Sequence, residues 1–199
     1  MAPCSLVRPK PKSLNFTDAG TIPGVGNTAV DIFKRLGAPW QPSDNITVVV
    51  TAGQGGTGFI AVQVAKLFGA RVATAATGPG LDLMKSLGVD FVVDYHKQDL
   101  FETLGNNSVD YVFDNIGANG TADKAMPSLR PGGSFMLLTG GGPGTLSKNP
   151  KEGVKQFESG IFQPSGAALD ALAGWFDAGL LRPHTFQSFG LSEVPAACV

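Results

Sequence analysis

The sequence predicts an α/β fold in which a doubly wound parallel sheet of about six strands carries helices on both faces. Short apolar or β-branched runs alternate with helical segments along most of the chain. This alternation is typical of parallel strands joined by right-handed crossovers. The composition agrees, because 43% of the 199 residues are hydrophobic and only 16% are charged. Such a chain can bury a sheet on both sides.

The stretch from Asn45 to Gly69 is the centre of the predicted fold. Residues 46–50 form a β-branched run that predicts a buried strand, and apolar residues recur at helical spacing over 60–68. Between them lies the dinucleotide-binding spacing G-x-G-x-x-G. A helix N-terminus behind such a turn favours a phosphate, because its unpaired N–H groups and its dipole both point there. We therefore expect the turn to bind a pyrophosphate through Gly53, Gln54, Gly55, Gly56, Thr57 and Gly58.

The glycines alone leave two alternatives. One is a tight strand-to-helix turn with no ligand, and the other is the similar turn with which methyltransferases bind a nucleoside. A methyltransferase would normally carry an acidic residue after the second strand, and none is present there.

The first 44 residues predict an N-terminal arm and linker helices, ahead of a nucleotide-binding domain over 45–199. Residues 1–11 are rich in proline and basic residues and predict an extended arm. A short helix is expected over 13–19, broken by Pro23 to Gly26. A second helix then begins at a cap on Asn27 or Thr28 and ends at Gly37.

The remaining elements follow in strict alternation. Strands are expected over 71–75, 91–95, 109–114 and 134–138, and helices over 81–87, 100–104, 122–129 and 167–178. Asp114 is expected to terminate its strand rather than to act as an acid or base. Residues 140–164 predict a mobile flap over the site or an ordinary surface excursion, and Leu180 to Phe189 a sixth strand.

Cofactor preference is predicted from the end of the second strand. Enzymes that use NAD place Asp or Glu there, about 20 residues after the glycines, to bind the ribose diol. Here that place holds Ala76, Thr77 and Gly78. Because a carboxylate would repel a 2′-phosphate, its absence favours NADPH, with Thr77 as a hydrogen-bonding partner. No arginine lies in this loop, since Arg71 is at the other end of the strand.

Charge and cysteine content exclude several classes of function. The net charge of −1 gives no reason to expect nucleic acid or a membrane as a partner. The only two cysteines, Cys4 and Cys198, lie at opposite ends of the chain. A chain with so few cysteines is typical of a reducing compartment. No signal-peptide or membrane-spanning run is visible, so a cytoplasmic location is expected. His96 and His184 lack ligand spacing, and no metal site is predicted.

Six segments in order resemble the medium-chain dehydrogenase/reductase superfamily, specifically its zinc-independent quinone oxidoreductase branch, which includes zeta-crystallin-like proteins. The resemblance implies a Rossmann-type sheet and NADPH-dependent hydride transfer to quinones or α,β-unsaturated carbonyls. Family members also carry a GroES-like domain before this region, so we expect a cofactor domain without that companion and incomplete at its C-terminus. The segments are PKSLNFTDAGTIPGVGNTA (11–29), VVVTAGQGGTGFIAVQVAKLFGA (48–70), MKSLGVDFVVDY (84–95), YVFDNIG (111–117), RPGGSF (130–135) and LDALAGWFDAGLLRP (169–183).

The resemblance also implies positions for further cofactor-binding residues, while the catalytic residues stay unknown. Lys85 has an alternative interpretation as a solvated helix lysine, and Thr28 as a helix cap. The resemblance places Lys85 and Tyr95 beside the 2′-phosphate, Asn115 and Gly117 under the adenosine and the nicotinamide ribose, Leu138, Thr139 and Gly140 at the nicotinamide amide, and Thr28 near the nicotinamide.

Two functional hypotheses follow. The first is an NADPH-dependent reductase of quinone or enone substrates, with activity reduced by the missing companion domain. The second is a non-catalytic NADPH-binding redox sensor or interaction module. In either case the uncovered cleft face should expose apolar surface, so a homo-oligomer, most simply a dimer, is expected.

Overall fold

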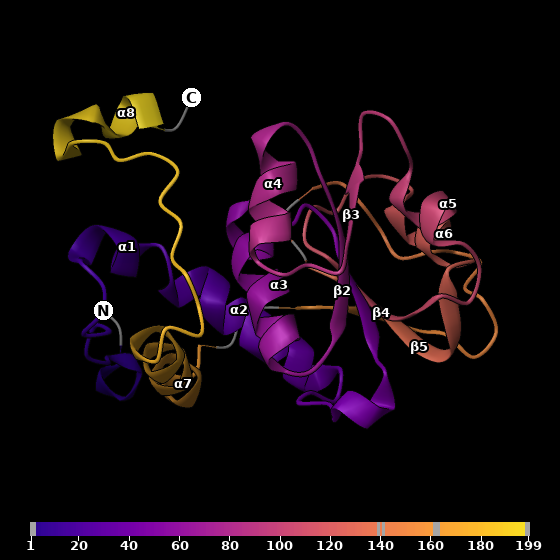
Figure 1. The fold of residues 1–199 in the computed structure, drawn as a ribbon, viewed down its shortest axis with the longest axis horizontal. Helices are drawn as coiled ribbons and strands as arrows, with labels where there is room; N and C mark the ends of the chain where they lie inside the picture. The colour runs from indigo at the N-terminus through magenta and orange to yellow at the C-terminus, as the bar shows by residue number, and fades with distance from the viewer. Residues whose placement is uncertain (1–2, 139, 141, 161–163, 198–199) are drawn as a thin grey trace.

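The computed structural model describes residues 3–138, 140, 142–160 and 164–197, and it contains a six-stranded sheet in the order β3-β2-β1-β4-β5-β6. Every neighbouring pair is parallel. The predicted doubly wound α/β fold is therefore confirmed (Figure 1). The strands are β1 (Thr47–Val50), β2 (Arg71–Ala76), β3 (Phe91–Asp94), β4 (Val109–Asp114), β5 (Leu129–Leu137) and β6 (Lys155–Glu158).

Helices cover both faces of the sheet because the strand side chains alternate between two apolar clusters. Val48 and Val50 of β1 pack into one cluster with α2, α3, α4 and α7, whereas Val49 packs into the other with α5 and α6. All three valines are fully buried, as expected for a strand covered on both sides. The helices are α1 (Phe16–Gly20), α2 (Pro23–Arg35), α3 (Gly56–Leu67), α4 (Pro79–Ser86), α5 (Leu100–Leu104), α6 (Thr121–Ala125), α7 (Gly166–Asp177) and α8 (Val194–Ala197), with 3₁₀ turns η1 (Cys4–Leu6), η2 (Pro42–Asp44) and η3 (Leu191–Glu193).

The start of α2 corrects the predicted helix boundary. Pro23 is the first residue of α2 rather than part of a break. Proline is favoured at this position because its missing N–H would have no helical partner. Thr28 consequently lies inside the helix, where its hydroxyl donates to the Gly24 carbonyl at 3.0 Å, and it caps nothing. The predicted end at Gly37 is confirmed, since α2 stops at Arg35 and Gly37 has a φ of +93°.

The sixth strand also lies elsewhere than predicted. β6 belongs to the stretch expected to be irregular, and it pairs with β5 from Ser134 opposite Lys155 to Leu137 opposite Glu158. Residues 180–189 form no strand. They are held instead by side chains: Gln63 of α3 accepts from the Arg182 N–H at 2.8 Å and donates to the Arg182 carbonyl at 3.1 Å.

Two further boundaries differ. α6 ends at Ala125, and β5 begins at Leu129 before the Pro131–Gly133 turn, which becomes a bulge against β4. The N-terminal arm is not wholly extended, because η1 occupies Cys4–Leu6.

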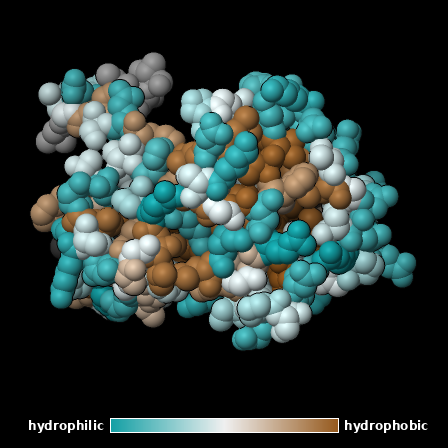
Figure 2. Space-filling model, in the orientation of Figure 1, coloured by the Kyte–Doolittle hydropathy of each residue, from teal (hydrophilic) through white to brown (hydrophobic). Residues whose placement is uncertain are grey.

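The two ends of the chain form a layer outside α2, which we call the terminal layer: residues 3–20, α7 and residues 180–197. Figure 1 shows these segments side by side, with α8 standing away from the sheet. Polar ties join the arm to α7, since Arg8 pairs with Asp170 at 2.8 Å and the Ser13 N–H donates to Asp177 at 2.8 Å. Apolar surface remains uncovered near α7 and the arm in Figure 2; Phe16 is 85% exposed.

Candidate functional site

The glycine-rich turn after β1 is built by close backbone packing. A Cβ on Gly58 would lie 2.1 Å from the Ala52 carbonyl oxygen, so only glycine fits where α3 crosses the end of β1. Gly53 is similarly confined, and its N–H donates to the Thr74 hydroxyl at 3.0 Å. The Gly55 N–H donates to Ala52 at 2.9 Å. Gly53 and Gly55 thus shape the turn with N–H groups that are already paired.

The N-terminus of α3 presents the unpaired donors. Gly55 caps the helix without a side-chain bond, and its carbonyl accepts the Phe59 N–H at 2.7 Å. The N–H groups of Gly56, Thr57 and Gly58 precede that first helical bond and have no acceptor within the helix. Gly56 is exposed, with open space where a Cβ would stand. An anionic group can therefore approach the backbone here.

A cavity of about 540 Å³ adjoins this turn at the carboxyl ends of the strands. Figure 2 shows apolar surface between the positions that α4 and α5 occupy in Figure 1. Among the predicted site residues the cavity contains Gln54, Gly55 and Tyr95. The structure adds residues from the β3–α5 turn and from α6 that were not predicted from the sequence. The full lining is Thr51, Ala52, Gln54, Gly55, Ala75, Tyr95, Gln98, Asp99, Leu100, Phe101, Asp114, Ile116, Thr121 and Lys124.

An ion pair stands at the side of this cavity. Lys124 of α6 lies 2.8 Å from Asp99, which also caps α5 through the Phe101 and Glu102 N–H groups. The hydrogen bond from Lys124 holds the pKa of Asp99 below its usual value, and Asp99 in turn raises the pKa of Lys124. The pair fixes α5 against α6 at the cavity wall.

The loop after β2 is occupied by internal contacts. The Gln54 side chain spans to it and accepts the Thr77 N–H at 2.9 Å. Asp94, at the end of β3, is paired in the sheet with Ala76, the residue before Thr77. The pKa of Asp94 lies below its usual value, chiefly because the His96 N–H donates to it and also through Lys97.

Asp94 is a residue that sequence reasoning missed. No carboxylate follows β2, but one reaches the same place from the neighbouring strand. The signal is the register of the sheet, which pairs Ala76 with Asp94 and could not be read before the strands were aligned.

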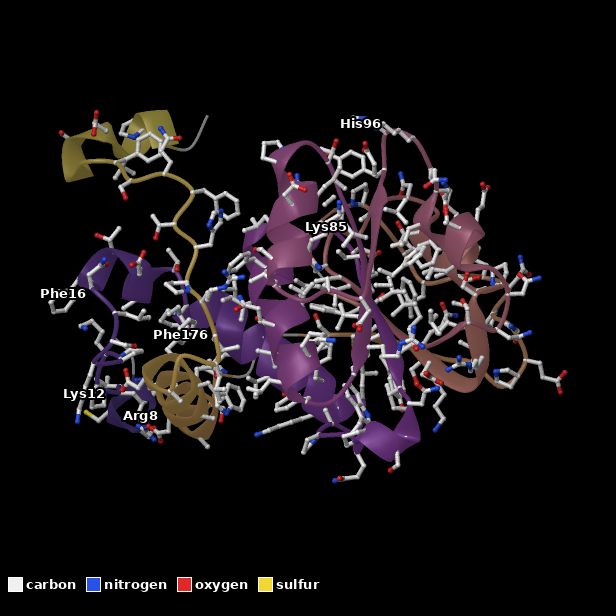
Figure 3. All side chains as sticks on the ribbon, in the orientation of Figure 1. Arg8, Lys12, Phe16, Lys85, His96 and Phe176 are labelled. Atoms are coloured by element: carbon white, nitrogen blue, oxygen red, sulfur yellow. The ribbon has the colours of Figure 1, made fainter. Side chains whose placement is uncertain are left out.

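The two residues predicted beside a 2′-phosphate lie on different elements. Lys85 is on α4 with its side chain 66% exposed, and its ammonium is 3.8 Å from Asp82. Tyr95 follows β3 and packs on His96 with ring centroids 4.6 Å apart. Figure 3 shows Lys85 and His96 away from the labelled residues of the terminal layer, and Lys85 lies in the last turn of α4. No hydrogen bond, ion pair or ring contact joins Lys85 to Tyr95, both of which lie in the described part of the chain.

The predicted nicotinamide residues divide between described and undescribed positions. Asn115 and Gly117 form the turn after β4, as expected, and Leu138 follows β5 with its N–H donating to Asp114 at 2.8 Å. Gly140 is exposed with a φ of +87°. Thr139 lies outside the described residues. Thr28 does not line the cavity, since its hydroxyl is bound within α2.

Within the described ranges, no three His, Cys, Asp or Glu side chains form a group that could hold a metal ion. In the same ranges, no helix is both long enough and apolar enough to cross a membrane.

Comparison with known proteins gives a family match. The family model described as "Zinc-binding dehydrogenase" matches residues 87–198, which is more than half of the chain. The match includes β3 to β6, α7 and the C-terminal segment.

Individual relatives match over most of this chain and over part of their own length. The mitochondrial NAD(P)H oxidoreductase RTN4IP1 of Danio rerio is 33% identical over 94% of this chain and 54% of its own. The 2-methylene-furan-3-one reductase of Solanum lycopersicum is 38% identical over 68% of this chain and 33% of its own. The quinone oxidoreductase of Coxiella burnetii superposes with a TM-score of 0.79 at 23% identity, over 95% of this chain and 58% of its own, which shows the shared fold. The chain thus spans about half the length, or less, of these proteins.

The same comparison corrects the expected location. The relatives from zebrafish, human and mouse are mitochondrial proteins. The prediction of a cytoplasmic location, which rested on missing signals in the sequence, is therefore wrong.

Proposed function

Because the chain belongs to the zinc-binding dehydrogenase family, in the zinc-independent quinone oxidoreductase-like branch of the medium-chain dehydrogenase/reductase superfamily, we propose that it is an NADPH-dependent reductase. The acceptors are quinones or α,β-unsaturated carbonyls. The observation that carries this proposal is the open N-terminus of α3 at Gly56, which follows Gly55, a lining residue of the cavity at the carboxyl ends of the strands. Relatives described as an NAD(P)H oxidoreductase and a 2-methylene-furan-3-one reductase support the reaction class.

The residues of the site fit a dinucleotide. The α3 N–H groups of Gly56 and Thr57 would hold the pyrophosphate. The apolar side chains of Leu100 and Ile116 at the cavity would receive the adenine. Asn115 and Leu138 would lie along the ribose and the nicotinamide. When bound, the nucleotide supplies the hydride, and the protein contributes binding, orientation and exclusion of water. Protonation of the acceptor is left to solvent.

NADPH rather than NADH is the proposed cofactor. Support comes from the absence of a carboxylate on residues 76–78 and from the exposed ammonium of Lys85. The carboxylate of Asp94 opposes NADPH, but it is paired with the ammonium of Lys97 at 3.4 Å.

The test is oxidation of NADPH by the full chain with a panel of small quinones and enones. We expect turnover above the protein-free rate, and less of it for Gly56→Ala, whose added methyl group would stand where the phosphate approaches. Saturating NADPH binding without turnover on any acceptor would contradict the enzymatic proposal.

That outcome would favour a second candidate, a non-catalytic NADPH-binding sensor or interaction module. The observation in its favour is the exposed apolar surface of the terminal layer, where Phe16 and Phe186 are 85% and 62% exposed. Such a surface supports self-association, most simply a dimer. Sedimentation velocity tests this: concentration-dependent dimers are expected, and a monomer at all concentrations would contradict self-association.

A further inference from the structure

The loops after β1 and β4 are joined by a buried carboxylate that the proposed hydride transfer does not itself use. Asp114, at the end of β4, is 1% exposed. Its Oδ1 accepts the Thr51 hydroxyl at 2.9 Å and the N–H groups of Ile116 and Gly117 at 3.2 Å each. Among the described residues, no lysine or arginine pairs with it.

Thr51 links the two loops by hydrogen bonds, and we call the hydrogen-bonded group of Thr51, Asp114 and Asn115 the clasp. The Thr51 hydroxyl donates to Asp114 and at the same time accepts the Asn115 N–H at 3.0 Å. The Asn115 side-chain amide donates back to the Thr51 carbonyl. Two hydrogen bonds thus join Thr51 to Asn115 and a third joins Thr51 to Asp114; the bond to Asp114 is buried, and the two to Asn115 are partly buried.

The turn held by this clasp also supports the loop after β5. The Gly144 N–H donates to the Gly117 carbonyl at 2.6 Å. A Cβ on Gly142 would lie 2.4 Å from the Gly117 oxygen and 2.7 Å from that of Ile116. Residues 115–117 therefore lie between the loop that leads to α3 and the loop after β5, with Ile116 facing the cavity.

A buried carboxylate without a cation is costly unless several donors satisfy it. Here the donors are two backbone N–H groups and one hydroxyl, and such charge-assisted bonds are about twice as strong as neutral ones. The arrangement sets the separation of the two loops, because every donor belongs to one loop or the other.

We propose that Asp114 and Thr51 are positioning residues for the dinucleotide: the clasp sets the distance between the pyrophosphate turn and the loops under the nucleosides. Both residues line the cavity, but in this proposal they act by holding the two loops and not by contact with the nucleotide. The proposal rests on the proposed nucleotide site, and it names the residues that keep the two loops of that site at a fixed distance.

The test uses three variants of the full chain, with NADPH affinity measured by calorimetry and the melting temperature recorded for each. Thr51→Val keeps the shape but removes the hydroxyl, and we expect about tenfold weaker binding, the usual size for a lost bond to a charged group. Thr51→Ser keeps the hydroxyl, so most of the affinity should return although the protein loses a buried methyl group. Thr47→Val, at the opposite end of β1, is the matched control and should bind as the parent does.

A double-mutant cycle identifies the partner. If the hydroxyl acts through the carboxylate, Thr51→Val should weaken binding no further in an Asp114→Asn background. Equal affinity of Thr51→Val and the parent, or affinity that follows the melting temperature across all variants, would overturn the clasp. Failure of the parent itself to bind NADPH would instead overturn the proposed function, so the two failures are distinguishable. Thr51→Val and Thr51→Ser decide the question by themselves if Asp114→Asn does not fold.

Discussion

The sheet with α2 to α6 and the terminal layer are stabilised in different ways. In the sheet region, residues such as Val49 and Phe33 are fully buried, and stability comes from apolar area removed from water. In the terminal layer the arm is fastened by polar contacts such as Arg8 to Asp170, while Phe16 remains in solvent. We therefore expect substitutions in the sheet region to change stability or nucleotide binding, and substitutions in the terminal layer to change self-association.

Two phenylalanine truncations break or support this comparison most directly. Phe33 packs edge-on against Trp40 and Phe113, with ring centroids 6.2 and 6.0 Å apart. Phe33→Ala should lower the free energy of unfolding by about 3–5 kcal/mol through the cavity it leaves. Phe16→Ala should change it by less than about 0.5 kcal/mol, because the ring is exposed, while it weakens self-association. Urea denaturation measures the free energy of unfolding of both variants. Equal losses for Phe33→Ala and Phe16→Ala would contradict the difference between the sheet region and the terminal layer.

Two glycines of the nucleotide turn separate stability from binding. Gly58→Ala places a methyl group against the Ala52 carbonyl and should cost about 2–3 kcal/mol of stability. Gly56→Ala meets nothing in the free protein, so its melting temperature should stay at or above that of the parent, with markedly weaker NADPH binding. Thermal unfolding with and without NADPH checks both, and unimpaired NADPH binding by Gly56→Ala would argue against a phosphate at the α3 N-terminus.

The exposed ammonium of Lys85 sharpens the question of cofactor choice. Lys85→Met should weaken NADPH about tenfold and leave NADH unchanged, since only the former carries the 2′-phosphate. Lys34→Met, in the last turn of α2, is the control. An equal loss of affinity for NADPH and NADH would show that Lys85 does not recognise the 2′-phosphate.

The Asp99–Lys124 pair at the cavity predicts an acid-dependent contribution to stability. The folded-state pKa of Asp99 is below the ordinary value of 3.8. Its stabilisation is therefore complete above that value and is lost as the pH falls through the lower folded-state pKa. Asp99→Asn should be about 1 kcal/mol less stable near neutral pH, a modest figure because Lys124 is largely exposed. The difference should vanish in strong acid, and a constant gap across pH would contradict the pair's role.

Local sequence predicted most of the sheet because its strands are β-branched or apolar runs between clear turn signals. β1 and β4 are of this kind, as Val48 to Val50 and Val109 to Asp114 show. β6 was missed because the run Lys155–Glu158 is polar and forms only by pairing with the edge of β5. The opposite error at 180–189 arose because an apolar segment can be held extended by side chains such as Gln63 alone.

The sequence predicted the glycine-rich turn, whose residues are contiguous. It did not predict the residues that the fold brings together from distant parts of the chain. The turn from Gly53 to Gly58 is contiguous, so its spacing was sufficient. Asp99 and Lys124 reach the cavity through helix packing, and Asp94 reaches the loop after β2 through strand register; no local pattern encodes either. The interpretation of Thr28 as a helix cap was wrong, because α2 begins at Pro23 and Thr28 lies inside the helix.

The central claim is that the α3 N-terminus and the adjoining cavity bind a nicotinamide dinucleotide. Isothermal titration of the full chain with NADPH and with NADH tests it most directly. We expect saturable heat for both nucleotides, with tighter binding of NADPH. Absence of heat with either, or tighter binding of NADH, would contradict it.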